Sequence, residues 1–253
     1  EIERQTVALA KELRVVGLMN IQFAVKDGVV FILEVNPRAS RTAPFVSKAT
    51  GVPLPRLATQ VMLGKTLKEL DPWSMRRSGY VSVKESVFPF RRFPGVDILL
   101  GPEMRSTGEV MGIAPTFEEA FLKGQWGAGQ KLPEGGKVFL SVNDRDKRFV
   151  AEVARQYVDL GFELLATSGT AGLLAGQGIP STRVLKVYEG RPNIVDLIKN
   201  GEVSLVINTA SGKRTAHDSK AIRQATLHYG VPYSTTLSGA KAIARAIGAA
   251  RTT

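Results

Sequence analysis

The sequence predicts an α/β protein whose second half forms a doubly wound, five-stranded parallel sheet. From residue 137 onward, five short apolar runs alternate with five segments of helical periodicity. The run Ser204-Leu205-Val206-Ile207 shows no polar alternation beyond its first residue, which is typical of a parallel strand buried on both faces. Residues 1–70 show a hairpin pattern between separate helices, so we expect an α+β segment there.

The composition is that of a globular protein and excludes several classes. Of the 253 residues, 43% are hydrophobic and 23% are charged, which argues against disorder. The absence of cysteine excludes disulfides, a cysteine nucleophile and thiolate metal ligands. No run of 18 apolar residues occurs, so we expect no membrane-spanning segment and a cytoplasmic location. The opening Glu1-Ile2-Glu3-Arg4 reads as the middle of a helix, and we expect a fragment of a longer protein.

The basic charge predicts small anionic ligands. The net charge is +11, and residues 131–253 carry 17 basic against 10 acidic side chains. The basic residues are spread over many elements, and aromatic residues for base stacking make up only 7% of the chain. We therefore expect pockets for phosphates or similar anions, and no nucleic-acid groove.

The first part of the chain predicts helices around a hairpin. Two β-rich runs are joined by Lys26-Asp27-Gly28, and Asp-Gly between such runs favours a tight hairpin turn. The stretch from Asn36 to Pro55 is interrupted by prolines and is expected to be a connection. The predicted elements are a helix at 2–14, strands at 18–25 and 29–35, and a helix near 55–63.

The rest of the chain predicts an interdomain region and an α/β domain. Residues 71–133 are rich in Pro and Gly, with a strand near 79–88, a helix near 116–123 and a linker at 124–136. We expect segment boundaries at 70/71 and 133/134. The third segment, 134–253, has predicted strands at 138–142, 162–166, 183–187, 203–207 and 231–235, and helices at 146–159, 170–176, 193–199, 217–228 and 239–248.

The predicted hairpin brings three oxygen-bearing side chains together. Gln22 lies on one strand and Glu34 on the other, and Asn36 shares a strand face with Glu34. One carboxylate and two amide carbonyls suit Mg²⁺, which takes few protein ligands besides substrate phosphates. Arg38 and Arg41 follow, where they could neutralise a transferring phosphoryl group. On spacing alone, a solvated strand end with an Asn-Pro turn explains the short E-x-N-P pattern better.

Longer motifs surround these residues. They read NIQF at 20–23, FILEVNPRASRT at 31–42, PFVSKATGVP at 44–53, VKE at 83–85, FPGVD at 93–97 and LGPEMRSTGEV at 100–110. The motifs resemble the end of an ATP-grasp domain, and more narrowly the second ATP-grasp unit of carbamoyl phosphate synthetase large subunits. Together with the C-terminal domain, the resemblance covers essentially the whole chain.

The resemblance implies a role for each residue of the hairpin site. It makes Gln22, Glu34 and Asn36 ligands of Mg²⁺ or Mn²⁺, and it makes Gln22 and Glu34 contacts of ATP. Arg38, with Arg41 nearby, would be catalytic and contact the phosphoryl group that passes to carbamate. The family is a ligase that makes carbamoyl phosphate for arginine and pyrimidine biosynthesis, with ammonia from a glutaminase small subunit. The chain shows no nucleotide-clamping lobe or glycine-rich loop ahead of these residues, so we expect the chain alone, without the remainder of the large subunit, to be inactive.

Hydroxyls and lysines recur where the predicted parallel strands end. Ligands of a doubly wound sheet bind beyond the carboxyl ends of its strands, where helix N-termini point. Thr167, Ser168 and Thr170 open a predicted helix and offer hydroxyl and N–H groups to an anion, while Lys147 and Lys186 supply positive charge. Ordinary helix capping explains any one of these residues equally well. Their recurrence after several strands favours an anion pocket.

This segment resembles the methylglyoxal-synthase-like regulatory domain of the same large subunits. The matching motifs are Lys147, TSGT at 167–170, KVYEGRP at 186–192 and Asn208-Thr209. In bacterial members they hold a nucleoside monophosphate, UMP or sometimes IMP. The resemblance places Thr167, Thr170 and Lys147 on the phosphate, and it completes the pocket with Ser141, Lys186, Asn208, Asp218 and Ser219. Ala210 departs from the pattern, since a Thr that bonds the ligand is expected there.

The resemblance also implies an ornithine site. Glu85 would pair with the amino group of ornithine, and Tyr233 and Thr235 would come from the last strand. A carboxylate is suited to an ammonium group. Exposed glutamates are common, however, so without the resemblance an ordinary surface carboxylate explains Glu85 equally well.

Two other functions compete with this interpretation. His217-Asp218 resembles a His-Asp pair of methylglyoxal synthase, but no carboxylate base lies within the segment 190–193. We interpret His217 as a polar residue at a helix start. A stand-alone nucleotide-binding regulatory module would share residues 137–253, but it would have no use for Gln22, Glu34 and Asn36.

Overall fold

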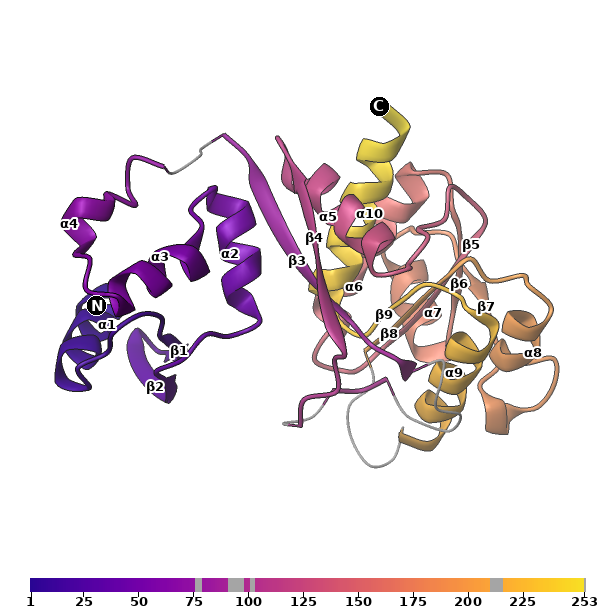
Figure 1. Cartoon of the computed structure of the whole chain (residues 1–253). Coiled ribbons are helices and arrows are strands. Elements are labelled where there is room, and N and C mark those ends of the chain that lie inside the picture. The colour runs from indigo at the N-terminus through magenta and orange to yellow at the C-terminus, as the bar shows by residue number, and fades with distance from the viewer. Residues whose placement is uncertain (76–78, 91–97, 101–102, 210–215, 253) are drawn as a thin grey trace. The chain divides into compact units, whose positions relative to one another are not determined.

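The chain folds into two compact units, Glu1–Val81 and Ser82–Thr253 (Figure 1). The computed structural model describes residues 1–75, 79–90, 98–100, 103–209 and 216–252, and it leaves out the side chains of residues 216–218. The first unit combines a two-stranded sheet with short helices, and the second is built around a five-stranded sheet.

The first unit begins with the helix and the hairpin that the sequence predicts. Its elements are α1 (Ile2–Glu12), β1 (Asn20–Lys26), β2 (Val29–Asn36), α2 (Thr42–Thr50), α3 (Leu54–Met62) and α4 (Leu67–Leu70). The strands β1 and β2 pair antiparallel, with Gln22 opposite Glu34. Asp27 and Gly28 have φ angles of 52° and 77°, so the turn has the left-handed backbone that Asp-Gly favours.

The structure corrects the prediction for the stretch from Asn36 to Pro55, which contains the helix α2. Pro44 is the third residue of α2, within the first turn, where a helix needs no backbone N–H donor. Gly51 ends the helix with a φ of 78°, a conformation that glycine adopts without strain. The prolines therefore punctuate helix starts here and do not exclude helices.

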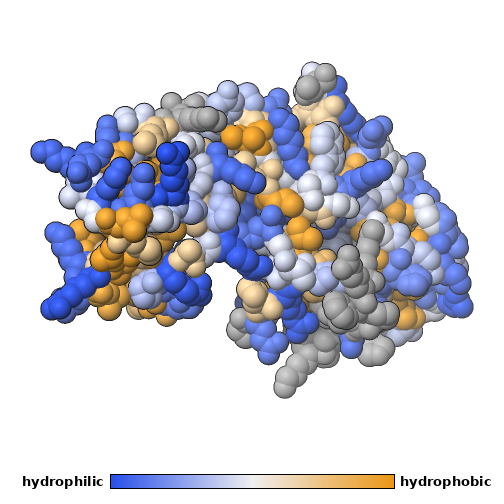
Figure 2. Space-filling view, in the orientation of Figure 1, coloured by the Kyte–Doolittle hydropathy of each residue, from blue (hydrophilic) through white to orange (hydrophobic). Residues whose placement is uncertain are grey.

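The core of the first unit is small. Within its described residues, Val52, Leu57 and Ala58 are the buried apolar side chains. An apolar cavity of about 330 Å³ lies beside them. Many other apolar side chains of this unit are exposed, and Figure 2 shows apolar groups at its surface. They include Ile2, Val7, Leu13, Val16, Val25, Val29, Phe31, Ile32 and Leu33. Exposed apolar surface of this extent is typical of a contact with further protein.

The second unit confirms the predicted parallel sheet. Its strands are β5 (Lys137–Val142), β6 (Glu163–Ala166), β7 (Thr182–Arg183), β8 (Leu205–Thr209) and β9 (Tyr233–Ser234). They lie in the order β7-β6-β5-β8-β9, and all four pairs are parallel. The strands β6 and β7 lie on one side of β5, and β8 and β9 lie on the other, as in a doubly wound sheet.

Helices cover both faces of this sheet. They are α6 (Lys147–Asp159), α7 (Ser168–Gly176), α8 (Ile194–Lys199), α9 (Ala216–Tyr229) and α10 (Leu237–Thr252). Alternate residues of β5 point to opposite faces. Val138 and Leu140 pack in one core with α6, α7 and α10, whereas Phe139 packs in the other core with α8 and α9. The sheet is thus the middle of three layers.

The third predicted strand, 183–187, is wrong in its extent. β7 ends at Arg183, and residues 187–189 form a 3-10 turn, η2 (Val187–Glu189). The carboxylate of Glu189 accepts a hydrogen bond of 3.0 Å from the backbone N–H of Lys186. This side-chain bond satisfies a backbone donor outside the sheet, so the chain turns away from the sheet edge.

A second two-stranded sheet packs against a helix at the start of this unit. β3 (Val81–Val87) agrees with the predicted strand, whereas β4 (Gly108–Ala114) was not predicted. The helix α5 (Phe117–Gly127) extends past its predicted end at residue 123. A Cβ atom at Gly112 would overlap the carbonyl oxygen of Ala120 and lie 2.6 Å from the nitrogen of Gly124. The backbone of α5 therefore touches β4 at Gly112, a residue without a side chain.

We expect Gly112→Ala to destabilise the second unit strongly, because the added methyl group forces β4 and α5 apart. Overpacking of this kind costs about 1–3 kcal/mol or more. The measurement is urea unfolding followed by the fluorescence of Trp126, which lies on α5. Gly108→Ala is the matched control, since a Cβ atom at Gly108 meets nothing within 4 Å. Equal stability of the two variants would contradict the close contact.

Candidate functional site

The structure brings the three predicted metal ligands of the hairpin together. Gln22 Nε2 donates a hydrogen bond of 2.8 Å to Glu34 Oε2, and Asn36 Nδ2 donates one of 2.8 Å to Glu34 Oε1. The pairing of β1 with β2 sets this geometry, because Gln22 is the cross-strand partner of Glu34. Gln22 and Glu34 are exposed and Asn36 is half-buried, so the cluster is open to solvent.

The donor set of this cluster fits a small divalent cation. Each amide gives an N–H group to the carboxylate, so its carbonyl oxygen is not engaged by Glu34. Rotation of the two amides would present three oxygen-bearing groups to an ion, the chemistry that Mg²⁺ prefers. No group of three or more His, Asp and Glu side chains suited to a metal ion occurs among the described residues. A cation site in this unit would therefore depend on the amides.

The two predicted catalytic arginines follow the cluster along the chain. Arg38 comes two residues after β2, and its side chain donates a hydrogen bond of 3.0 Å to the carbonyl oxygen of Ala39. Arg41 lies at the start of α2. Both residues are exposed. The structure thus puts both cations on the connection between β2 and α2, and Arg38 is held by the backbone of that connection.

The predicted nucleotide residues meet at the carboxyl ends of the central strands. Ser141 on β5 is the cross-strand partner of Asn208 on β8. Thr167 precedes α7, and its hydroxyl donates a hydrogen bond of 3.4 Å to the hydroxyl of Thr170. Thr167, Thr170 and Asn208 are 4%, 1% and 1% exposed. Neither polar atom of the Asn208 side chain has a hydrogen-bond partner among the described residues. A buried amide without partners is costly, and a bound polar ligand would satisfy it.

Two of the predicted lysines meet around Asp144. Lys147 Nζ lies 2.6 Å from Asp144 Oδ1, and it also lies close to Gly169 at the start of α7. The hydrogen bond from Lys147 lowers the pKa of Asp144, and the charge of Lys186 contributes to the same shift. Lys147 thus lies at the N-terminus of α7, where an anion would also find the positive end of the helix dipole, and Lys186 adds positive charge to the same region.

Four further residues named in the sequence analysis differ in how far the structure describes them. Ser219 is a buried residue of α9, 7% exposed. The side chains of Asp218 and His217 lie outside the described residues, and Ala210 lies outside them altogether.

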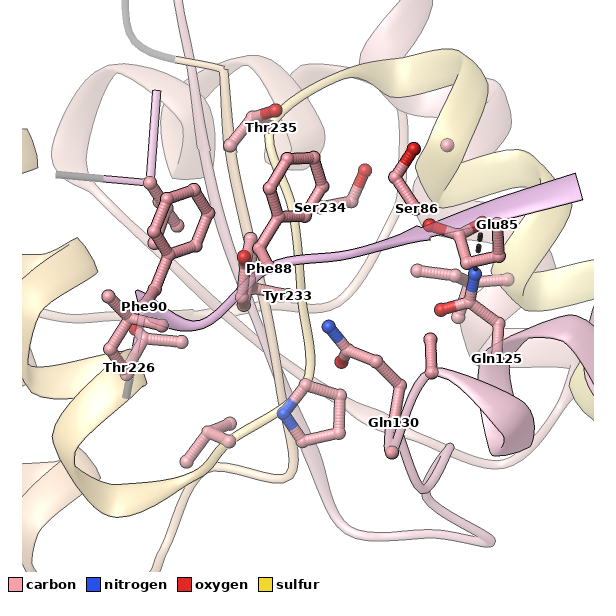
Figure 3. A pocket seen from close by; sticks show the side chains of 18 of the residues that line it. Glu85, Ser86, Phe88, Phe90, Gln125, Gln130, Thr226, Tyr233, Ser234 and Thr235 are labelled. Carbon is pink, nitrogen blue, oxygen red and sulfur yellow. Dashed lines mark hydrogen bonds between the residues drawn. The ribbon is translucent and has the colours of Figure 1, made fainter. Parts of the chain in front are cut away.

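The three predicted ornithine residues line one cavity of about 630 Å³ in the second unit (Figure 3). Glu85 comes from β3, Tyr233 from β9, and Thr235 directly follows β9. Burial raises the pKa of Glu85, and a hydrogen bond from Gln125 opposes that shift. Aromatic side chains form part of the wall, with the rings of Phe88 and Phe90 stacked at 5.0 Å. Among apolar, hydroxyl and amide groups the cavity thus presents one carboxylate, which suits an amine, together with one cation, Lys131.

Comparisons with known proteins find a family model for each of the two units. Residues 1–70 match the family model "Carbamoyl-phosphate synthase L chain, ATP binding domain", and residues 149–235 match the "MGS-like domain". The chain is 54% identical to a carbamoyl phosphate synthase large chain of Mesorhizobium japonicum over 98% of its length. It is 56% identical to that of Pasteurella multocida over 98% and 55% identical to that of Rhodopirellula baltica over 100% of its length. Over the part that it spans, the chain belongs to the carbamoyl phosphate synthase large-chain family. It spans 22% to 24% of the length of these relatives.

Sequence reasoning missed two polar residues that contact predicted site residues. Asp144 contacts Lys147 beside the start of α7, and Gln125 contacts Glu85 at 2.9 Å in the cavity of about 630 Å³. Asp144 lies three residues before Lys147 and just after a predicted strand, which was an available signal. Gln125 lies between glycines and therefore read as part of a linker. None of the helices in the described part of the chain is long and apolar enough to cross a membrane.

We expect Asn208→Leu to raise the stability of the ligand-free chain by about 1–2 kcal/mol. Leucine has a similar shape and removes a buried amide that lacks partners, a group that costs about 1–3 kcal/mol. The same change at Asn193 is the matched control. Asn193 is equally buried, but its oxygen caps α8 by accepting bonds from Val195 and Asp196. Asn193→Leu is expected to lower the stability by about 1–2 kcal/mol. Chemical unfolding measures both, and a destabilised Asn208→Leu would show that the amide is satisfied.

Proposed function

We propose that the chain works as part of the large chain of a glutamine-dependent carbamoyl phosphate synthase. In this proposal its first unit belongs to the C-terminal ATP-grasp site, which phosphorylates carbamate to carbamoyl phosphate with ATP. The observation that carries the proposal is the cluster of Gln22, Glu34 and Asn36, which offers oxygen ligands to a cation from one strand pair. The match of residues 1–70 to the carbamoyl-phosphate synthase L chain model and the identity of the chain to large-chain relatives support it.

The cluster would hold Mg²⁺ or Mn²⁺, with Glu34 as the charged ligand and the two amides as neutral ones. The ion would neutralise negative charge on the phosphates of ATP. Gln22 and Glu34 would thereby also contact ATP through the ion. Phosphoryl transfer needs positioning and charge neutralisation more than covalent catalysis, and this cluster offers both.

Arg38 and Arg41 would act on the transferring phosphoryl group. A guanidinium group binds phosphate oxygens through two hydrogen bonds and keeps its charge at all accessible pH values. The bond from Arg38 to the carbonyl oxygen of Ala39 leaves further N–H groups of the same guanidinium for a ligand. The connection between β2 and α2 would thus supply the positive charge beside the metal ligands.

The second unit would bind regulatory ligands. Thr167, Thr170 and Lys147 would hold the phosphate of a nucleoside monophosphate, UMP or IMP. The pocket would be completed by Ser141, Lys186, Asn208, Asp218 and Ser219. The buried amide of Asn208 and the position of Lys147 beside the start of α7 support this assignment. The cavity that holds Glu85, Tyr233 and Thr235 would bind ornithine through its amino group.

The biological setting follows from the same proposal. The chain would belong to a cytoplasmic ligase of arginine and pyrimidine biosynthesis, whose glutaminase small subunit supplies ammonia. Residues 1–70 would end the ATP-grasp domain, residues 71–133 would join it to the regulatory domain, and residues 134–253 would form that domain. The 253-residue chain by itself would not turn over ATP.

The metal assignment predicts a loss of cation affinity in Glu34→Gln. We expect weak Mn²⁺ binding to the unmodified chain and at least tenfold weaker binding to the variant, because the substitution removes the charged ligand and keeps the shape of the side chain. Electron paramagnetic resonance of free Mn²⁺ measures the affinity. Glu12→Gln is the control, an exposed carboxylate on α1. Unchanged Mn²⁺ binding in Glu34→Gln would refute this site.

The nucleotide assignment predicts that UMP or IMP binds the chain and that Lys147→Ala weakens the binding about 10- to 100-fold. A hydrogen bond to a charged group is worth about 1.5–3 kcal/mol, which corresponds to that change. Isothermal titration calorimetry at low and high salt measures the affinity. Lys199→Ala removes a lysine from the end of α8 and serves as the control. If neither nucleotide releases heat with the unmodified chain, the pocket has another ligand or none.

A further inference from the structure

Gln125 lines the same cavity as Glu85 and contacts it directly. Its Nε2 atom donates a hydrogen bond of 2.9 Å to Glu85 Oε2 (Figure 3). Gln125 is 8% exposed, so this polar side chain is almost entirely removed from water. Both residues are lining residues of the cavity of about 630 Å³. Since the bond engages only Oε2, the other carboxylate oxygen, Oε1, is left for a ligand.

The packing of α5 fixes where Gln125 can be. A Cβ atom at Gly124 would lie 3.6 Å from Cβ of Glu85 and 3.9 Å from the nitrogen of Gly112. These are ordinary contact distances, so α5 passes beside β3 one residue before Gln125. The tight contact is at Gly112, where an added Cβ atom would lie 2.6 Å from the nitrogen of Gly124. This contact sets α5 against β4 and places the amide of Gln125 beside the carboxylate of Glu85.

We propose that Gln125 is a positioning residue of the amine cavity, which holds one oxygen of Glu85 so that the other meets the ammonium group of the ligand. This inference rests on the proposed amine site. The amide of glutamine is neutral, so it orients the carboxylate and leaves its negative charge for the ligand. A cationic side chain in the same place would compete with the amine.

The bond also acts on the charge of Glu85. Burial raises the pKa of this carboxyl, and the hydrogen bond from Gln125 lowers it again. Without Gln125 the effect of burial is unopposed, and Glu85 takes up its proton at a higher pH. A protonated carboxyl does not attract an ammonium group, so amine binding is lost as the pH falls through the pKa of Glu85.

Other charged and titratable groups lie near Glu85 or line the same cavity. Lys131 and the phenol of Tyr233 line the same cavity. Lys84 Nζ lies 3.5 Å from Glu109 Oε1, an ion pair that joins β3 and β4. The residues that α9 and α10 contribute to the cavity wall carry no charge: Thr226, Leu227, Gly239 and Ile243. Gln125 is the bond partner that the structure records for the Glu85 carboxylate among the described residues.

The test compares Gln125→Met with Gln177→Met in the whole 253-residue chain. Methionine keeps the length of the side chain without a donor, and Gln177 is an exposed residue at the end of α7 that does not line the cavity. Ornithine binding is measured by calorimetry from pH 5 to pH 8. The carboxyl of Glu85 is titrated by NMR in the ligand-free chain. We expect Gln125→Met to bind ornithine at least fivefold more weakly at neutral pH. We also expect its acid-side midpoint and its Glu85 titration to shift to higher pH, with Gln177→Met unchanged in both.

Each outcome decides a separate point. If the unmodified chain binds ornithine and Gln125→Met keeps the same pH profile and the same Glu85 titration, the role of Gln125 is wrong although the amine site stands. If the unmodified chain does not bind ornithine, the proposed amine site fails and this role fails with it. If Gln125→Met does not fold, the proposal is tested with Gln125→Leu and with the NMR titration of Glu85 in the unmodified chain. A Glu85 that titrates as in an exposed glutamate would then overturn the inference.

Discussion

The burial of both faces of the parallel sheet is the constraint on which the second unit depends. Val138, Phe139 and Leu140 on β5 are completely buried, because helices cover the sheet from either side. Buried polar side chains therefore gather where the strands end and the helices begin. Asn208 and Thr209, the last two residues of β8, mark this edge of the core, and they are 1% and 3% exposed. Pocket chemistry at this edge is a consequence of how the layers are stacked.

The two candidate sites of this unit are built by different means. At the proposed nucleotide site, the parallel strands bring Ser141, Thr167 and Asn208 to one end of the sheet, and helix starts supply N–H groups. In the cavity that Glu85 lines, the contact between Gly112 on β4 and the backbone of α5 brings the helix onto the strand pair. The first site depends only on the order of the layers, whereas the second depends on glycine at particular positions.

The sequence predicted the fold class, the hairpin and the five-stranded sheet, because these depend on local periodicity and on the turn at Asp27-Gly28. It did not predict β4, since Gly108 and Gly112 read as breakers until the helix that packs on them is known. It overlooked α2, because prolines in a first helical turn look like interruptions. Gln125 was missed for a related reason: its role depends on a contact 40 residues away along the chain. Clusters of neighbouring residues such as Gln22, Glu34 and Asn36 could be found from register alone, whereas contacts between distant segments could not.

The hairpin cluster has only one formal charge, since Glu34 is flanked by two neutral amides. A doubly charged ion seated there would remain one unit positive, and nothing in the three side chains cancels that excess. Such a site would bind its ion tightly only when an anionic ligand binds together with it. Because Gln22 and Asn36 are neutral, the metal ion and a polyphosphate would bind as a pair. Free metal ions in the cell would bind the site only weakly on their own.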